Sequence, residues 1–444
     1  MATMKLASWA SSLEYSTIPE SVRKAAIRSF YNWAGCAIGG SNHPATIIAH
    51  DSLQAFFGAP TSSLLGQTAT RVDAQHAALL NGIASHVHDY DDTHLETIIH
   101  PTGPVASALL AFAESQPQAV GGEDFLLAMI AGIEAECKIG LAVWPDHYDV
   151  GWHITSTTGA IGAAVAVGRL LKLDAERMAH AIGIAAAQVT GLREMFGSHA
   201  KSFHVGRAAQ NGLIAALLAK GGFTSSTRAL EAKRGWANVV SAVQKLDELM
   251  ASLGKAWETQ KNSFKPFPCG IVIHPIIDGC AQLKPDVDAT GKQIGSIRAR
   301  VHPLVLELTG KKKPKDGLEA KFSVYHGGAL GLLYGKATPA LYEDCVATDP
   351  KVVNIRDKIE ASEDNSLAAD EAYITVTFED GSEVEKHVVH AIGSTEVPMT
   401  DEQLTAKFVD QCQSLLGGRT QQVSDALWRI ESAPGIAQLI RGLY

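Results

Sequence analysis

Residues 157–171 read TTGAIGAAVAVGRLL. The stretch is apolar throughout and dominated by small side chains, which predicts a buried helix that its neighbours approach closely. Segments of the same character surround it at Val105–Ala113, Phe125–Leu141, Met178–Val189 and Ala208–Ala219. A further helix is expected to open at Pro19-Glu20-Ser21, because proline is favoured at a helix start. Residues 21 to 255 are therefore predicted to form a tightly packed helical bundle.

The pattern changes after Lys265-Pro266-Phe267-Pro268-Cys269-Gly270, which is predicted to be a boundary loop. Residues 294–305 are β-branched and apolar, and residues 372–389 predict a β-hairpin around Glu379-Asp380-Gly381-Ser382. Residues 329–335 and 351–361 look helical between these strands. This part is predicted to be a smaller α+β domain.

The chain then returns to helical character. Thr400-Asp401-Glu402-Gln403 is predicted to be a capping box before a helix at residues 404–416. Helices are also expected at residues 423–430 and 436–443. The fold class is therefore mainly α, with a large all-helical domain from residues 1–265 and 398–444 and an α+β domain from residues 266–397.

Composition excludes several classes of partner. The 444 residues carry a formal net charge of −9 and no Lys/Arg block, which argues against nucleic acid. No apolar run is long enough to predict a membrane span, and residues 1–15 show no leader sequence. Six scattered cysteines predict free thiols in a reducing compartment. We expect a cytoplasmic enzyme without a membrane partner.

Chemistry-bearing residues gather in one segment above all. Residues 86–101 read HVHDYDDTHLETIIHP and place four histidines, three aspartates and a glutamate between apolar helices. Such groups are costly near a core unless they are paired, and histidine titrates close to neutral pH. The segment is therefore predicted to be one wall of an active site.

Five further candidate residues lie outside that segment. They are His153 before the 157–171 helix, Lys201 and His204 in a predicted loop at residues 197–207, Lys265 in the boundary loop, and Tyr325. Taken singly, a histidine here is more often structural and a lysine more often a surface residue. The candidates gain weight together, because all are expected in loops that flank helices.

Other site types have weaker support. The chain has no GxGxxG, GxxxxGK[ST] or GxSxG motif in a fitting context, which argues against dinucleotide, phosphate-loop and serine hydrolase chemistry. A remote alternative is a metal-dependent hydrolase. Its ligands would be His86, His88, Asp89 and Asp92.

These motifs resemble those of the MmgE/PrpD family over essentially the whole chain. The resemblance is carried by Asp89-Tyr90-Asp91-Asp92-Thr93, His100-Pro101, His153, Lys201-Ser202-Phe203-His204-Val205-Gly206 and Lys265-Pro266-Phe267-Pro268-Cys269-Gly270. It implies an all-helical domain built from both terminal segments, an α+β lid and a cleft between them. It also implies a homodimer that acts without cofactor or metal on a small polycarboxylate.

The resemblance further implies roles for individual residues. The residues implied to be catalytic are Asp89, His100, His153, Lys201 and Tyr325. Those implied to bind substrate are Thr93, Lys201, His204 and Lys265.

The expected reaction places negative charge on a carbon beside a carboxylate. Lys201 and Lys265, with a protonated His153 or His100, would stabilise that charge. Asp89 would orient a histidine, and a histidine would transfer the proton.

The family includes 2-methylcitrate dehydratase, cis-aconitate decarboxylase and iminodisuccinate epimerase, and the same residues could serve each reaction. His100-Pro101-Thr102-Gly103 looks closer to the decarboxylases and epimerases than to the dehydratases. The spacing from Thr93 to His100, however, looks one residue longer than in the animal decarboxylase. We expect a cofactor-independent lyase of an aconitate-like substrate, most readily a decarboxylase, with an epimerase or a dehydratase as alternatives.

Overall fold

The computed structural model describes residues 1–67 and 70–443, which form two compact units. Unit 1 contains residues 1–87, 91–262 and 404–444, and unit 2 contains residues 88–90 and 263–403. Both terminal segments therefore contribute to unit 1. The fold is mainly helical with a smaller α+β part, as the sequence predicts.

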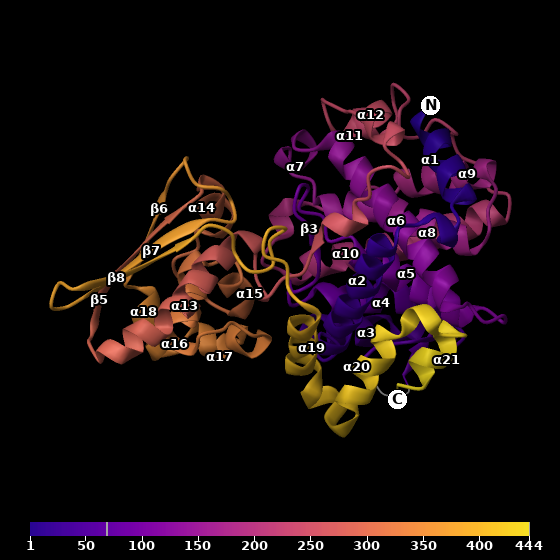
Figure 1. The fold of residues 1–444 in the computed structure, drawn as a ribbon. Helices are drawn as coiled ribbons and strands as arrows, with labels where there is room; N and C mark the ends of the chain where they lie inside the picture. The colour runs from indigo at the N-terminus through magenta and orange to yellow at the C-terminus, as the bar shows by residue number, and fades with distance from the viewer. Residues whose placement is uncertain (68–69, 444) are drawn as a thin grey trace. The chain divides into compact units, whose positions relative to one another are not determined.

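Unit 1 is built almost entirely of helices (Figure 1). Its helices are α1 (Ala2–Ser12), α2 (Glu20–Gly39), α3 (Pro44–Leu53), α4 (Ala74–His86), α5 (Thr102–Ser115), α6 (Gly122–Val143), α7 (Asp146–Asp149), α8 (Ile154–Leu170), α9 (Ala175–Ala186), α10 (His199–Lys220), α11 (Trp236–Val240), α12 (Leu246–Ala251), α20 (Thr420–Trp428) and α21 (Ile436–Arg441). Helix α19 (Asp401–Leu416) begins at the boundary between the units. Short strands β1 (Ser62–Ser63), β2 (Arg71–Val72) and β3 (Thr93–His94) interrupt the helices, and β4 (Asn262–Ser263) lies where the chain leaves the unit.

Small residues bring the central helices of unit 1 together. Helix α10 packs against α4 and α8, and α8 packs against α6. A Cβ atom on Gly206 would lie 2.2 Å from the carbonyl oxygen of Leu79, so only glycine allows α10 to approach α4 this closely. This contact fixes the N-terminal half of α10 against the middle of α4.

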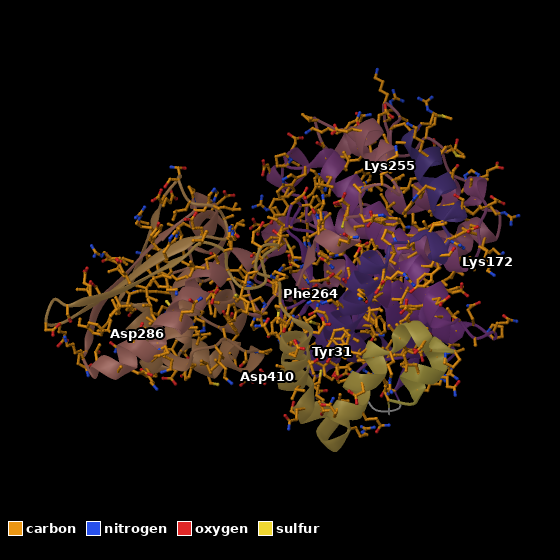
Figure 2. All side chains as sticks on the ribbon, viewed as in Figure 1. Tyr31, Lys172, Lys255, Phe264, Asp286 and Asp410 are labelled. Atoms are coloured by element: carbon orange, nitrogen blue, oxygen red, sulfur yellow. The ribbon has the colours of Figure 1, made fainter. Side chains whose placement is uncertain are left out.

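The C-terminal segment completes the core of unit 1. Figure 2 shows Tyr31 of α2 among the side chains of this unit; Tyr31 is buried, whereas Lys172 and Lys255 are exposed. The Tyr31 ring stacks on Trp428 at a centroid distance of 4.1 Å and contacts Phe408 at 5.2 Å. Aromatic burial of this kind stabilises the union of the two terminal segments.

Unit 2 combines a four-stranded sheet with helices. Its elements are α13 (His274–Thr290), β5 (Ile294–Val301), α14 (Pro303–Thr309), α15 (Gly317–Ala320), α16 (Val324–Tyr334), α17 (Asp344–Ala347), α18 (Pro350–Arg356), β6 (Ile359–Glu363), β7 (Ala372–Phe378) and β8 (Glu383–Val388). The strand order is β6-β5-β7-β8, with β5 parallel to β6 and antiparallel to β7. Alternate residues of β7 are buried, and α13 packs on β7 and β8.

Local signals predicted several elements of unit 2 and its exit correctly. The hairpin of β7 and β8 forms with Thr377 opposite Glu383. The capping box is also present, because Thr400 N–H donates to Gln403 Oε1 and Gln403 N–H donates to Thr400 Oγ1.

Two predictions in unit 2 were wrong in extent. The expected strand at residues 294–305 ends at Val301, because His302 caps α14 through Leu304 N–H and Pro303 opens that helix. The expected helix at residues 351–361 ends at Arg356, and Ile359 begins a strand that pairs with Ile297. Pairing with β5 overrides the local helical pattern there.

Within residues 1–67 and 70–443, every helix is too short or too polar to cross a membrane. The six cysteines are free, and five of them are buried.

Candidate active site

Four buried histidines of unit 1 form one cluster, which we call the histidine cluster: His86, His100, His153 and His204. His86 ends α4, His100 lies two residues before α5, His153 caps α8, and His204 lies in α10. The ring centroids are 4.9 Å apart for His86 and His100, 6.0 Å for His86 and His153, and 5.2 Å for His153 and His204. Positions in or directly before four helices that are separate in sequence thus form one continuous row of imidazole rings.

Asp91 is the carboxylate that faces this cluster within unit 1. Its Oδ2 atom accepts a hydrogen bond from His86 Nδ1 at 2.7 Å, and its Oδ1 atom lies 3.7 Å from His100 Nδ1. His86 Nε2 has no hydrogen-bond partner among the residues that the structure describes. Sequence reasoning did not select Asp91, because spacing within the Asp89-Tyr90-Asp91-Asp92 loop does not reveal which carboxylate turns towards a histidine.

The position of His100 fixes its tautomer. Its Nδ1–H donates to the backbone oxygen of Asp92 at 2.8 Å, and Thr93 Oγ1 lies 3.2 Å from the same nitrogen. The backbone N–H of His100 donates to Thr155 Oγ1. With its proton held on Nδ1, the neutral ring presents Nε2 for proton exchange.

Asp92 turns away from the histidines. Its Oδ2 atom accepts hydrogen bonds from Thr102 Oγ1 and Asn262 Nδ2. Burial, with some help from the charge of Asp91, raises the pKa of Asp92 to about 6 although these hydrogen bonds oppose the shift.

The set His86, His88, Asp89 and Asp92, proposed for a metal-dependent hydrolase, is divided between the two units. His88 and Asp89 belong to unit 2, while the Asp92 carboxylate is engaged by Thr102 and Asn262. A different set in unit 1 offers donor atoms within 4.8 Å of one another, namely His86, Asp91 and His100. Its His86 Nδ1 and Asp91 Oδ2 atoms are already hydrogen bonded to each other, so a metal would have to displace that pair.

Lys201 and His204 lie inside α10, so the prediction of a loop at residues 197–207 was wrong from His199 onward. The packing of Gly206 against α4 favours a helix there. Lys201 is largely buried, and its Nζ atom lies 5.2 Å from the centroid of the Phe196 ring. The pKa values of His153 and His204 both respond to its charge.

His153 and His204 are hydrogen bonded to each other through their Nδ1 atoms. Their Nδ1 atoms lie 3.0 Å apart, so one must donate to the other. Burial first, and then neighbouring histidines and Lys201, hold the pKa of His153 well below its usual value and lower the pKa of His204 to about 4. These shifts favour neutral rings while no anion is bound, and the role predicted for a protonated His153 or His100 stays a prediction.

The remaining predicted residues belong to unit 2. Lys265 Nζ donates to Asp89 Oδ1 at 2.6 Å and to the Asp89 backbone oxygen at 3.1 Å. Asp89 has a left-handed φ of 52°, which aspartate tolerates better than most residues and which this double contact holds in place. Tyr325 is buried in the first turn of α16, not in a loop, with Lys312 Nζ 5.5 Å from its ring centroid. Their predicted catalytic and binding roles stay predictions.

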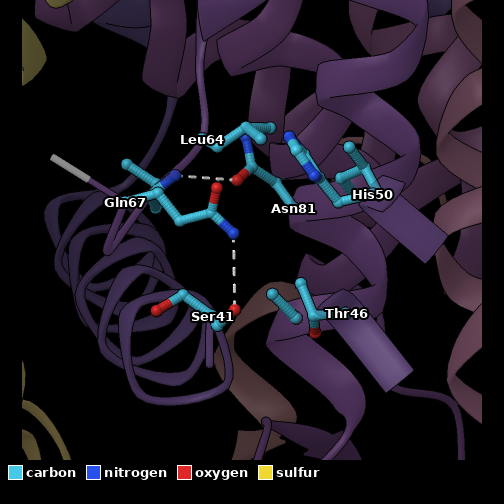
Figure 3. Close-up of a pocket in the computed structure, with 9 residues that line it drawn as sticks. Ser41, Thr46, His50, Leu64, Gln67 and Asn81 are labelled. Atoms are coloured by element: carbon cyan, nitrogen blue, oxygen red, sulfur yellow. Dashed lines mark hydrogen bonds between the residues drawn. The ribbon is translucent and has the colours of Figure 1, made fainter. Parts of the chain in front are cut away.

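A separate small hollow lies near α3 and α4 (Figure 3). Its lining consists of Ser41, Thr46, His50, Leu64, Leu65, Gln67, Leu80, Asn81 and Ala84. Its polar groups bond to each other, since Leu65 N–H donates to Asn81 Oδ1 and Gln67 Nε2 donates to the Ser41 oxygen. None of the predicted site residues lines it, and we assign it to packing.

A buried group of hydrogen-bonded histidines beside a carboxylate and a lysine is the arrangement of an acid–base enzyme. The chain belongs to the MmgE/PrpD family. It matches the MmgE/PrpD N-terminal domain over residues 4–249 and the MmgE/PrpD C-terminal domain over residues 267–430. The chain is thus a lyase or isomerase of this family.

Named relatives carry two activities. The cis-aconitate decarboxylase-like protein oryM of Aspergillus oryzae is 27% identical over 99% of this chain and 96% of its own length. The cis-aconitate decarboxylase of Homo sapiens is 27% identical over 81% of this chain and 77% of its own length. The 2-methylcitrate dehydratase of Salmonella typhimurium is 27% identical over 52% of this chain and 51% of its own length.

Proposed function

We propose that this enzyme is a cofactor-independent decarboxylase of a cis-aconitate-like tricarboxylate. The observation that carries the proposal is the setting of His100, a buried imidazole with Nδ1 fixed on a backbone oxygen and a carboxylate 3.7 Å away. Similarity to a cis-aconitate decarboxylase over 81% of the chain, and to a decarboxylase-like protein over 99%, supports it, whereas similarity to the dehydratases covers about half.

In the proposed reaction, one carbon–carbon bond breaks and CO₂ leaves. The bonding electron pair stays on the substrate and spreads into the neighbouring carboxyl-conjugated double bond. Lys201 would stabilise the negative charge that accumulates there, because a fixed cation in a buried site needs no reorganisation. A proton delivered to carbon completes the dicarboxylate product.

His100 would deliver that proton from Nε2. The imidazolium form has a proton on both nitrogens, and the Asp91 carboxylate near Nδ1 favours this charged form. After transfer, the neutral ring keeps Nδ1–H on the Asp92 oxygen and regains its proton from solvent. His153 and His204 would take up protons as the anionic substrate raises their pKa values, and their ring N–H groups would then donate hydrogen bonds to its carboxylates.

The test is proton NMR in D₂O with cis-aconitate, trans-aconitate, citrate, 2-methylcitrate and iminodisuccinate, each supplied separately. We expect cis-aconitate to give itaconate with deuterium at one carbon and equimolar CO₂. The His100→Asn variant serves as the control for contaminating activity. Gain or loss of water would instead identify a dehydratase, and deuterium exchange without loss of a group would identify an epimerase. If none of the five compounds changes, all of them are excluded as substrates.

A homodimer in the cytoplasm remains our expectation from the sequence.

A further inference from the structure

The loop that carries His100 is held in a strained conformation. His94 N–H donates to the backbone oxygen of Ile99 at 2.7 Å, and Thr97 N–H donates to the oxygen of His94. Between these contacts Ile98 has a φ of 58°, which is unfavourable for a β-branched side chain. Such a conformation persists only where its surroundings hold it. The group that holds His94 in place therefore also determines the backbone conformation that leads into His100.

That group is a buried carboxylate, Glu258. Its Oε2 atom lies 3.2 Å from His94 Nε2, and its Oε1 atom accepts from Lys138 Nζ at 3.0 Å. Lys261 Nζ lies 3.0 Å from Oε2. We call Lys138, Glu258 and His94 the Glu258 hub, and all three side chains are almost completely buried.

The hub joins parts of unit 1 that are distant in sequence. Lys138 comes from the middle of α6, Glu258 follows α12, and His94 lies in β3 (Figure 1). The opposite nitrogen of His94, Nδ1, lies 2.7 Å from Thr97 Oγ1 inside the loop. The imidazole of His94 therefore connects the Lys138–Glu258 ion pair to the loop. The backbone of His94 is in turn hydrogen bonded to Ile99, the residue before His100.

We propose that Glu258 is a positioning residue that acts through His94 and Thr97 to hold His100 in its reactive place. This inference rests on the proposed function, since it takes His100 as the proton donor. Glu258 itself touches neither the histidine cluster nor a reacting atom. Its effect on catalysis is geometric, and small displacements of a catalytic group are expected to lower the rate steeply.

The decisive variant is Thr97→Val, which removes the hydroxyl at His94 Nδ1 and leaves the Lys138–Glu258 pair intact. We expect kcat to fall roughly 10- to 100-fold with KM within a factor of about two. Glu258→Gln should act in the same direction, and Glu258→Asp should recover part of the rate. If Glu258→Gln fails to fold, Thr97→Val still decides the question.

The matched control is Ser63→Ala. It removes a buried hydroxyl that donates to Glu114 Oε1 at 2.7 Å in the same unit, away from the loop. We expect it to lower the melting temperature about as much as Thr97→Val while kcat stays unchanged. If Thr97→Val and Glu258→Gln also leave kcat unchanged, the hub is structural only and the proposal is overturned.

A second readout does not depend on turnover. Among the 17 histidines, the ring signals of His100 can be identified in histidine-labelled protein by comparison with His100→Asn. Thr97→Val should shift those signals and the pH at which they titrate, whereas Ser63→Ala should not. Unchanged His100 signals would reject the positioning role. If the wild type is inactive on these substrates but Thr97→Val still shifts the His100 signals, the proposed function is rejected and the positioning role is kept.

Discussion

The histidine cluster and the Glu258 hub both bury ionisable groups in unit 1, yet they satisfy them differently. In the hub, both carboxylate oxygens of Glu258 receive charged or ring donors. Burial alone would raise the pKa of Glu258, but hydrogen bonds from His94 and Lys138 bring it far below its usual value. In the cluster, His86 Nε2 has no partner among the described residues, and the His153 and His204 rings are hydrogen bonded only to each other, at Nδ1.

This difference separates structure from chemistry. A fully paired charge holds its protonation state and resists change, so the hub is suited to fixing backbone. Neutral histidines with depressed pKa values gain protons once an anion arrives, so the cluster is suited to proton transfer. Substitutions in the cluster should therefore lower activity more than stability, and substitutions in the hub should affect stability first.

The largest effect is expected for His100→Asn. Loss of the proton-transfer group should lower kcat by roughly 10²–10⁴-fold with little change in melting temperature. Steady-state kinetics by NMR or by CO₂ release would measure it. A loss below about tenfold would show that His100 is a structural residue, and the histidine cluster would then not differ in role from the Glu258 hub.

A substitution in the hub should lower stability more than it lowers the rate. Lys138→Met leaves Glu258 buried beside an apolar side chain and should lower the free energy of unfolding by about 3–5 kcal/mol. Urea denaturation would measure the loss. Lys24→Met is the control, because its partner Glu20 is solvent-exposed and such surface pairs contribute little to stability. Equal losses of unfolding free energy in the two variants would show that Lys138 does not stabilise the buried Glu258 carboxylate.

Lys201→Met tests the cation of the cluster. Removing a fixed positive charge from the site should lower kcat by about 10²–10³-fold. Lys220→Met is the matched control at the other, exposed end of the same helix, and it should leave the rate unchanged. Full activity of Lys201→Met would leave the developing negative charge without its proposed stabiliser.

The smallest effect concerns pH. The folded pKa values of His204 and His147 are lowered to about 4, mainly by burial, so below about pH 6.5 the unfolded chain binds protons that the folded chain does not. Stability should therefore fall as pH decreases from 6.5 to 4.5. Glu258 contributes stability above its unfolded pKa, near 4.5, and loses it only below that value.

Urea denaturation of wild type and His204→Gln between pH 7.5 and 4.5 would check this assignment. The variant should lose less stability over that range, by on the order of 1 kcal/mol after allowance for solvent screening. His390→Gln is the opposite control, because Asp370 raises the pKa of His390 and stabilises the folded state at low pH. A slope that His204→Gln leaves unchanged would mean that its ring is already protonated.

The amino-acid sequence by itself determined the helices, the hairpin, the capping box and the gathering of histidines in residues 86–101. These features depend on hydrogen bonds and side-chain patterns within a few residues, such as Thr400 with Gln403. Tertiary structure alone decided which groups meet. It turned Asp91 towards His86, placed Lys201 in a helix, and brought His153 to His204 across 51 residues. Those pairings depend on close packing of α10 against α4 and α8. Packing brings together side chains that are far apart in sequence, and a local sequence pattern contains no information on the distance between them.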